Sequence, residues 1–243
     1  MKAGFRTDRG RVREINEDAV LVDLSFGLFI AADGMGGHAG GEIASGIAVE
    51  TISQSVKDSI RVECTTEEVY QILMDALTQA HETIVEQTDR DNALKGMGTT
   101  IVLALQHPSG LYVAHVGDSR AYLIKDRAVK QLTKDHTVVA QIMESGVVSR
   151  KEAKKHRLRH VLSQALGSTP SLMPGIQVLE LKSEEYVLLC TDGLTDLVED
   201  SELRAIVLHC KGEPQRACED LIELANERGG RDNITAILLY EEG

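Results

Sequence analysis

The sequence contains no tryptophan, and aromatic residues make up only 3% of its 243 positions, so aliphatic side chains must fill the core. It has no uninterrupted apolar run near the roughly 20 residues that span a bilayer. The N-terminal stretch MKAGFRTDRGRVREINED also lacks the apolar segment of a secretory signal. These absences predict a cytoplasmic protein without a membrane partner.

Cysteine is scarce and follows no ligand pattern. The four cysteines form no CxxC pair, and none has a nearby histidine at zinc-finger spacing; they are Cys64, Cys190, Cys210 and Cys218. Free thiols in a reducing compartment are the simplest interpretation.

Positive charge is also in deficit, with 26 lysines and arginines against 38 acidic residues and a net charge of -12 at pH 7. This balance argues against nucleic acid as a partner, because phosphate backbones are bound by lysine and arginine. It is compatible with a protein that binds cations, and equally with an acidic surface that only keeps the protein soluble.

No internal repeat, low-complexity tract or linker divides the chain, so we predict one domain over residues 1–243. Apolar runs with turn residues between them predict paired strands at 19–23, 27–32, 99–105, 111–116, 120–125, 128–132, 186–190 and 234–240. Helical periodicity predicts long helices from residues 41 and 66, and a third begins near Pro214. Hairpins interrupted by long helices indicate the α+β class, with antiparallel sheets covered by helices.

Acidic residues recur where apolar strands begin or end. The stretch FIAADGMGGHAGGE reaches Asp33 and then becomes rich in glycine. Four further strand ends carry acids, at Asp118, Asp192, Asp232 and the pair Glu17 and Asp18. Each alone is more simply a turn residue, because aspartate and glycine commonly form turns.

Five acidic strand ends together favour a different interpretation. If they converge, the carboxylates repel one another and lose solvation, so either their pKa values rise or cations lie among them. Carboxylates and glycine carbonyls are hard oxygen ligands, which select Mg²⁺ or Mn²⁺ over Zn²⁺. Two such ions about 3.5–4 Å apart can hold a phosphate for in-line attack.

Eight motifs now carry a resemblance to a known family. In chain order they are RVREINED (11–18), ADGMGGHAGGE (32–42), GMGTT (96–100), VGDSRAYL (116–123), LTKDHT (132–137), LSQALG (162–167), LLCTDGLTD (188–196) and RDNITAILL (231–239). The sequence is similar to the metal-dependent protein phosphatases (PPM, also called type 2C), in particular the compact bacterial serine/threonine enzymes. The resemblance implies a four-layer α-β-β-α sandwich, with two antiparallel sheets between helices and a small flap at about 137–162.

The same resemblance implies the ligand set for two to three Mn²⁺ or Mg²⁺ ions. Asp33 would bridge two ions, the carbonyl of Gly34 would bind the first, and Asp192 and Asp232 would complete the second. Asp118, with Asp192, resembles a third-metal site. Glu17 and Asp18 would act through metal-bound waters or as weak ligands.

The catalytic roles also follow from the resemblance. A hydroxide bridging the metals would attack phosphorus, so no serine or cysteine nucleophile is required. Arg13 resembles the arginine that holds the phosphate, and a guanidinium can bind two phosphate oxygens at once. Asp18 is expected to be a catalytic residue, together with Arg13 and His38. For the general acid, His38 and a metal-bound water both remain open.

The flap contains a basic stretch, SRKEAKKHRLRH, that predicts either a solvated helix face or a lip attracting phosphopeptides. The function implied is a monomeric phosphoric monoester hydrolase, a protein-serine/threonine phosphatase whose partners are phosphorylated proteins and a cognate bacterial kinase.

Three alternatives deserve comparison. Residues 34–39 match a GxGxxA dinucleotide-binding pattern, but Asp33 would lie beside the pyrophosphate. A non-catalytic phosphoprotein-binding module would not need every expected ligand, yet all are present. A phosphatase acting on anti-sigma-factor antagonists would keep the fold and change the substrate.

Overall fold

Strand β3 (Leu28–Met35) is covered on both faces, which explains why its first half is apolar at every position rather than at alternate ones. Leu28 and Ile30 pack toward a layer of helices. Phe29 and Ala31 pack toward a second sheet. A strand with this burial must lie in the centre of a layered structure.

The computed structural model describes residues 1–36, 40–153 and 155–242. Within them the strands form two sheets whose neighbours all run antiparallel. The first sheet has the order β1 (Lys2–Asp8), β11 (Ile234–Tyr240), β10 (Tyr186–Cys190), β7 (Arg120–Lys125) and β8 (Ala128–Gln131). The second has the order β2 (Asp18–Asp23), β3, β5 (Ile101–His107), β6 (Gly110–Val116) and β9 (Gly175–Leu179), with β4 (Gly98–Thr99) also paired to β3.

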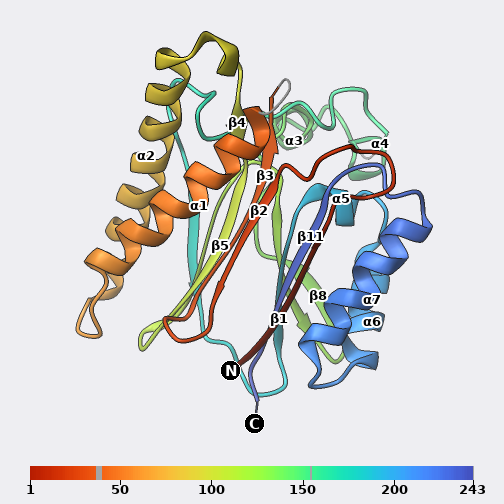
Figure 1. Ribbon diagram of the computed structural model, residues 1–243. Coiled ribbons are helices and arrows are strands. Elements are labelled where there is room, and N and C mark those ends of the chain that lie inside the picture. The colour runs from red at the N-terminus through yellow and green to blue at the C-terminus, as the bar shows by residue number, and fades with distance from the viewer. Residues whose placement is uncertain (37–39, 154, 243) are drawn as a thin grey trace.

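Helices cover the outer face of each sheet, as Figure 1 shows. On the second sheet lie α1 (Gly40–Ser59) and α2 (Thr66–Arg90). On the first lie α6 (Asp200–His209) and α7 (Pro214–Glu227). A separate apolar cluster fills the space between the sheets. This is the predicted α-β-β-α sandwich, and the predicted α+β class is confirmed.

The remaining helices are short and connect these layers. They are η1 (Asn92–Leu94), α3 (Val138–Glu144), α4 (Arg150–Ala153) and α5 (Asp192–Thr195). Helices α3 and α4 lie in the segment predicted as a flap. None of the helices in the described ranges is both long and apolar enough to cross a lipid bilayer.

Local signals set the ends of the long helices. Thr65 caps α2, since its hydroxyl accepts a hydrogen bond from the Glu68 amide while the Glu68 carboxylate accepts one from the Thr65 amide. A cap of this kind contributes about 1 kcal/mol. Pro214 begins α7, where its missing amide hydrogen costs nothing.

Two strands lie outside the sequence prediction, and both are at sheet edges. Strand β1 is exposed or half-buried everywhere except Gly4, and β9 is half-buried or exposed throughout. An edge strand shows little apolar alternation because neighbours cover it incompletely, which explains why the pattern did not reveal these two.

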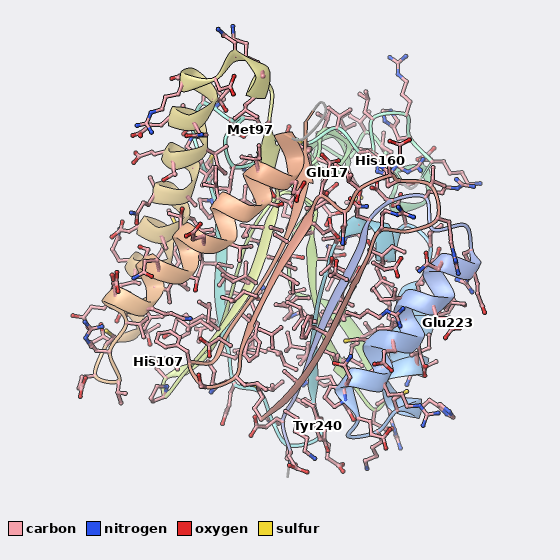
Figure 2. All side chains as sticks on the ribbon, viewed as in Figure 1. Glu17, Met97, His107, His160, Glu223 and Tyr240 are labelled. Atoms are coloured by element: carbon pink, nitrogen blue, oxygen red, sulfur yellow. The ribbon has the colours of Figure 1, made fainter. Side chains whose placement is uncertain are left out.

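The sandwich has two distinct ends. Figure 2 places Glu17 and His160 at one end and His107 and Tyr240 at the other. Strands β3, β6 and β10 finish toward the first end, and β2 and β11 begin there, so the acidic strand ends converge.

Candidate active site

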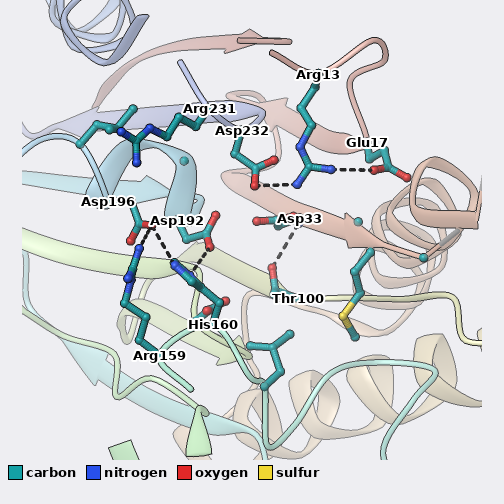
Figure 3. A pocket seen from close by; sticks show the side chains of 17 residues that line it. Arg13, Glu17, Asp33, Thr100, Arg159, His160, Asp192, Asp196, Arg231 and Asp232 are labelled. Carbon is teal, nitrogen blue, oxygen red and sulfur yellow. Dashed lines mark hydrogen bonds and ion pairs between the residues drawn. The ribbon is translucent and has the colours of Figure 1, made fainter. Parts of the chain in front are cut away.

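A cavity of about 580 Å³ opens where these strand ends meet, and both charge signs line it. Its six acidic residues are Glu17, Asp33, Asp118, Asp192, Asp196 and Asp232. Its four basic residues are Arg13, Arg159, His160 and Arg231. Figure 3 shows Arg13 and Asp232 on one side of Asp33 and Thr100 on the other.

Asp18 joins the two sheets beneath this cavity. It begins β2 and lies directly opposite Asp33 in the β2–β3 pairing. Its Oδ2 accepts hydrogen bonds from the hydroxyls of Thr191 (3.0 Å), which directly follows β10, and Thr235 (2.6 Å), which lies in β11. Both strands belong to the other sheet. The Oδ1 atom of Asp18 is buried without a hydrogen-bond partner. Burial raises the pKa of Asp18 to about 7.

The pKa values of the other central carboxylates shift in opposite directions. Burial, together with the charges of neighbouring aspartates, raises the pKa of Asp33 and of Asp118 well above the usual range. Burial also opposes the charge of Asp192, but its interactions with His160 and Asp33 prevail and lower the pKa of Asp192. So many close carboxylates cannot all be charged unless cations compensate them.

Gly34 allows three chain segments to meet at the end of β3. A Cβ atom at this position would lie 2.1 Å from the carbonyl oxygen of Gly41 and 2.5 Å from that of Glu17. Only glycine lets the strand end approach the first turn of α1 and the segment before β2 so closely.

Asn233 holds the loop that carries Arg13. Its side-chain oxygen accepts a hydrogen bond from the Glu17 amide (2.8 Å), and its side-chain nitrogen donates to the carbonyls of Arg9 (3.0 Å) and Ile15 (2.9 Å). Asn233 therefore fastens the loop at both ends. This structural role explains why asparagine follows Asp232 in the RDN motif.

Arg13 reaches over the cavity from that loop. Its Nη2 lies 2.8 Å from Oδ2 of Asp232, and its Nη1 lies 3.9 Å from Oε2 of Glu17. The hydrogen bond with Asp232 raises the pKa of Arg13 despite its partial burial. The guanidinium thus lines the cavity and contacts two of its carboxylates, those of Glu17 and Asp232.

A second cationic contact comes from the segment predicted as the flap. His160 Nδ1 lies 3.7 Å from Oδ2 of Asp192, and its Nε2 lies 3.4 Å from Oδ2 of Asp196. Arg159 Nη2 is 3.9 Å from the same Asp196 oxygen. Its contact with the Asp192 carboxylate raises the pKa of His160, so its positive form is favoured here.

These contacts involve residues that the sequence predictions missed. His160 and Arg159 were seen only as part of a basic stretch, although Arg159 and Lys155 line a neighbouring cavity of about 850 Å³. Asp196 had a signal, because it stands four residues after Asp192, at the C-terminal cap of α5. Arg231 lines the cavity and has no ion pair or hydrogen bond with any residue in the described ranges.

The donor set can be tested for its fit to a metal. Within the described part of the chain, no three histidine, cysteine or acidic side chains already form a closed ligand set. Several of the carboxylates contact a basic side chain: Arg13 contacts Glu17 and Asp232, and His160 contacts Asp192 and Asp196. However, Oε1 of Glu17 and Oδ1 of Asp18 are buried and unpartnered, and every acidic donor is a hard oxygen. The residues therefore fit a hard divalent cation, provided that the side chains of Arg13 and His160 move away from the carboxylates that they contact.

The structure brings most of the predicted site residues together. Arg13, Glu17, Asp33, Gly34, Asp118, Asp192 and Asp232 all line the one cavity. Asp18 lies beneath it, hydrogen-bonded between the sheets. The prediction for His38 lies outside the described residues.

Comparison with known proteins points to one family. Residues 14–234 match the family model described as protein phosphatase 2C. The chain is 36% identical over 245 residues to the serine/threonine phosphatase stp of Listeria monocytogenes, covering 100% of this chain and 96% of that protein. It is similar to the crystal structure of the Mycobacterium tuberculosis serine/threonine phosphatase PstP/Ppp, with a TM-score of 0.90, 33% identity, and coverage of 100% and 99%.

A further solved structure contains metal. It is the catalytic domain of the serine threonine protein phosphatase PstP in complex with two manganese ions. The TM-score is 0.84 and the identity 32%, with 98% of this chain and 96% of that chain covered.

Proposed function

Because the chain belongs to the protein phosphatase 2C family, and is on that ground a protein serine/threonine phosphatase, we propose that it hydrolyses phosphoserine and phosphothreonine by metal-assisted, in-line attack of water on phosphorus. The observation that carries the mechanism is the convergence of acidic strand ends from both sheets on one cavity. That convergence supports a cation site because the carboxylates otherwise repel one another.

The proposed ligands are Asp33, the Gly34 carbonyl, Asp192 and Asp232 for two ions, with Asp118 and Asp192 for a third. Glu17 and Asp18 hold and orient the waters around them. Mn²⁺ or Mg²⁺, when bound, supplies charge neutralisation at phosphorus and acidifies water near neutral pH. The manganese ions of the PstP structure support this choice of metal.

Arg13 is proposed to hold the phosphate. Its guanidinium is already suspended over the cavity by the Asn233-anchored loop, and phosphate oxygens can replace the carboxylates of Asp232 and Glu17 as its acceptors. Two parallel hydrogen bonds would fix the orientation of the phosphoryl group. For the proton that the leaving oxygen requires, His38 stays a candidate beside water.

Residues 1–243 are proposed to form one monomeric catalytic domain, with residues 137–162 as its flap. Lys155 and Arg159, which line the cavity beside the flap, support attraction of phosphopeptides. A kinase that phosphorylates serine and threonine is the proposed physiological counterpart. A phosphoprotein-binding role without catalysis has no supporting observation, since the full expected ligand set is present.

Hydrolysis of phosphothreonine and phosphotyrosine peptides tests the reaction directly. With Mn²⁺ or Mg²⁺ we expect release of phosphate from phosphothreonine, and with EDTA we expect none. Asp192→Ala and Asp232→Ala should each lower kcat/KM by more than the roughly 100-fold that loss of an indirect metal partner can cause. Circular dichroism should show a retained fold.

Asp118→Ala separates the third site from the other two. Its activity should fall while calorimetry still counts two bound Mn²⁺ ions. Full hydrolysis after chelation, or wild-type turnover in Asp232→Ala, would contradict the proposed mechanism. Two empty core sites in Asp118→Ala would contradict the assignment of Asp118.

A further inference from the structure

Two buried hydroxyl groups connect the strand ends that carry Asp33 and Asp118. The Oγ1 atom of Thr100 and the Oγ atom of Ser119 are 2.6 Å apart, and the two residues are only 2% and 1% exposed. Thr100 follows β4, and Ser119 lies in the turn between β6 and β7. Neither residue was assigned a role by the sequence motifs that contain it.

Thr100 holds the main chain of Asp33 at two points. Its hydroxyl oxygen accepts a hydrogen bond from the Asp33 amide (3.1 Å), and its own amide donates to the Asp33 carbonyl (2.9 Å). Thr99 adds a third bond, from its hydroxyl to the same carbonyl (2.8 Å). The backbone position of Asp33 is therefore set largely by this pair of threonines.

Thr100 also contacts both neighbours of Asp118. Its hydroxyl meets Ser119 on one side. On the other, a Cβ atom on Gly117 would lie 2.6 Å from the Thr100 methyl carbon, so the glycine turn rests directly on this side chain. Gly117 has φ of +100°, which favours glycine independently.

The hydrogens of the two hydroxyls can be assigned by elimination. If Thr100 donated to Ser119, the Ser119 hydrogen would be buried and no described group is placed to accept it. If Ser119 donates to Thr100, the free hydrogen belongs to Thr100, which lines the cavity and can meet an acceptor there. The second arrangement avoids a buried unpaired donor, and it makes Ser119 the support of Thr100.

We propose that Thr100, supported by Ser119, is a positioning residue of the phosphatase site, which fixes the spacing between the Asp33 backbone and the Asp118 turn. This inference rests on the proposed function, since the spacing matters only if both carboxylates serve the same metal cluster. Thr100 acts through Asp33 and Asp118, so its loss should weaken metal binding more than peptide binding.

The test is calorimetric titration of the metal-free protein with Mn²⁺, together with phosphopeptide kinetics. Thr100→Val keeps the shape of the side chain and removes the hydroxyl. We expect its dissociation constant for Mn²⁺ to rise about tenfold, equivalent to one net hydrogen bond, with KM for the peptide within about twofold of wild type. Thr100→Ser, which restores the hydroxyl, should recover most of the affinity.

Ser119→Ala tests whether the Ser119 hydroxyl supports Thr100. We expect about threefold weaker Mn²⁺ binding, and no further weakening when it is combined with Thr100→Val, because contacting residues are not additive. Thr78→Val is the matched control. Its hydroxyl bonds the Met74 carbonyl (2.9 Å) on the exposed face of α2, so metal affinity should not change.

Wild-type Mn²⁺ affinity in Thr100→Val, or full additivity with Ser119→Ala, would overturn the inference. If Thr100→Val does not fold, Ser119→Ala and Thr100→Ser decide: wild-type affinity in Ser119→Ala then overturns it. A wild-type protein that neither binds Mn²⁺ nor hydrolyses phosphopeptides would contradict the proposed function instead, so the two failures are distinguishable.

Discussion

Asp18 illustrates how a single buried carboxylate depends on pH. An aspartate in an unfolded chain has a pKa near 3.9, and in the folded, metal-free protein burial raises the pKa of Asp18 to about 7. Below about pH 4 the group is protonated in both states. Between the two values only the folded state keeps the proton, so this contribution to stability is lost as pH rises toward 7.

We therefore predict a pH-dependent effect of Asp18→Asn in the presence of EDTA. Asparagine cannot ionise, so the variant should gain stability relative to wild type as pH rises from about 4 to about 7. The gain should be on the order of a few kcal/mol, since each pKa unit corresponds to about 1.4 kcal/mol. Urea unfolding across this range measures it, and a constant difference between the proteins would refute the prediction.

The acidic residues of the site were easier to predict from the sequence than the residues that hold them in place. Asp33, Asp192 and Asp232 were predictable because each follows or precedes an apolar run. Thr100 and His160 were not, because their partners are distant in sequence: Thr100 meets Ser119 and His160 meets Asp192 only after folding. A hydroxyl or imidazole inside a motif carries no signal of which residue it will contact.

Among the elements, the end of β3 makes the most restrictive contact. Gly34→Ala would place a methyl group 2.1 Å from the Gly41 carbonyl oxygen, so α1 or β3 must move. We expect a loss of about 1–3 kcal/mol in the free energy of unfolding, as for overpacked cores, and weaker Mn²⁺ binding. Thermal or urea unfolding of the variant provides the measurement.

Gly46→Ala is the control for this prediction. Gly46 is an exposed residue of α1, and a Cβ atom there would meet nothing within 4 Å. Alanine in a helix interior is favoured over glycine by roughly 0.5–1 kcal/mol, so this variant should be more stable than wild type. Equal stability of the two alanine variants would show that the contact at Gly34 is unimportant.

Elements were predictable in proportion to their burial and length. Strand β10 and helix α2 carry clear apolar patterns, because one is fully buried and the other has a long buried face. Helix α5 has four residues, too few for any periodicity, and was read only as the end of a motif. Edge strand β1 was missed because its side chains are largely exposed.

Metal binding should also be visible in the whole molecule. A ligand that binds only the folded state at 100 times its dissociation constant stabilises it by about 2.7 kcal/mol. For a chain of this size we expect Mn²⁺ to raise Tm by roughly 5–10 °C. Asp192→Ala should show little of this shift in differential scanning fluorimetry. An equal shift in both proteins would place the Mn²⁺ effect elsewhere on the acidic surface.

The α+β class could be predicted from the sequence because long helices interrupt the hairpins, whereas the four-layer arrangement was implied by the resemblance to a known family. What periodicity alone could not supply is which strands join which sheet. Strand β11 lies between β1 and β10, although it is the last strand of the chain. Such pairing depends on the complete chain, and neither the apolar pattern nor the resemblance to a known family specified it.

The pairing of β1 with β11 has a practical consequence for the design of fusion proteins and circular permutants. Lys2 is in register with Tyr240, and the Lys2 ammonium lies 2.5 Å from a carboxylate oxygen of Glu242, so the two chain ends meet. Tyr240 stands at the end of the sandwich away from Glu17 and His160. A short peptide tether could join the ends into a circular permutant, and a fluorescent fusion placed there would leave the mouth of the cavity open to bulky phosphoproteins.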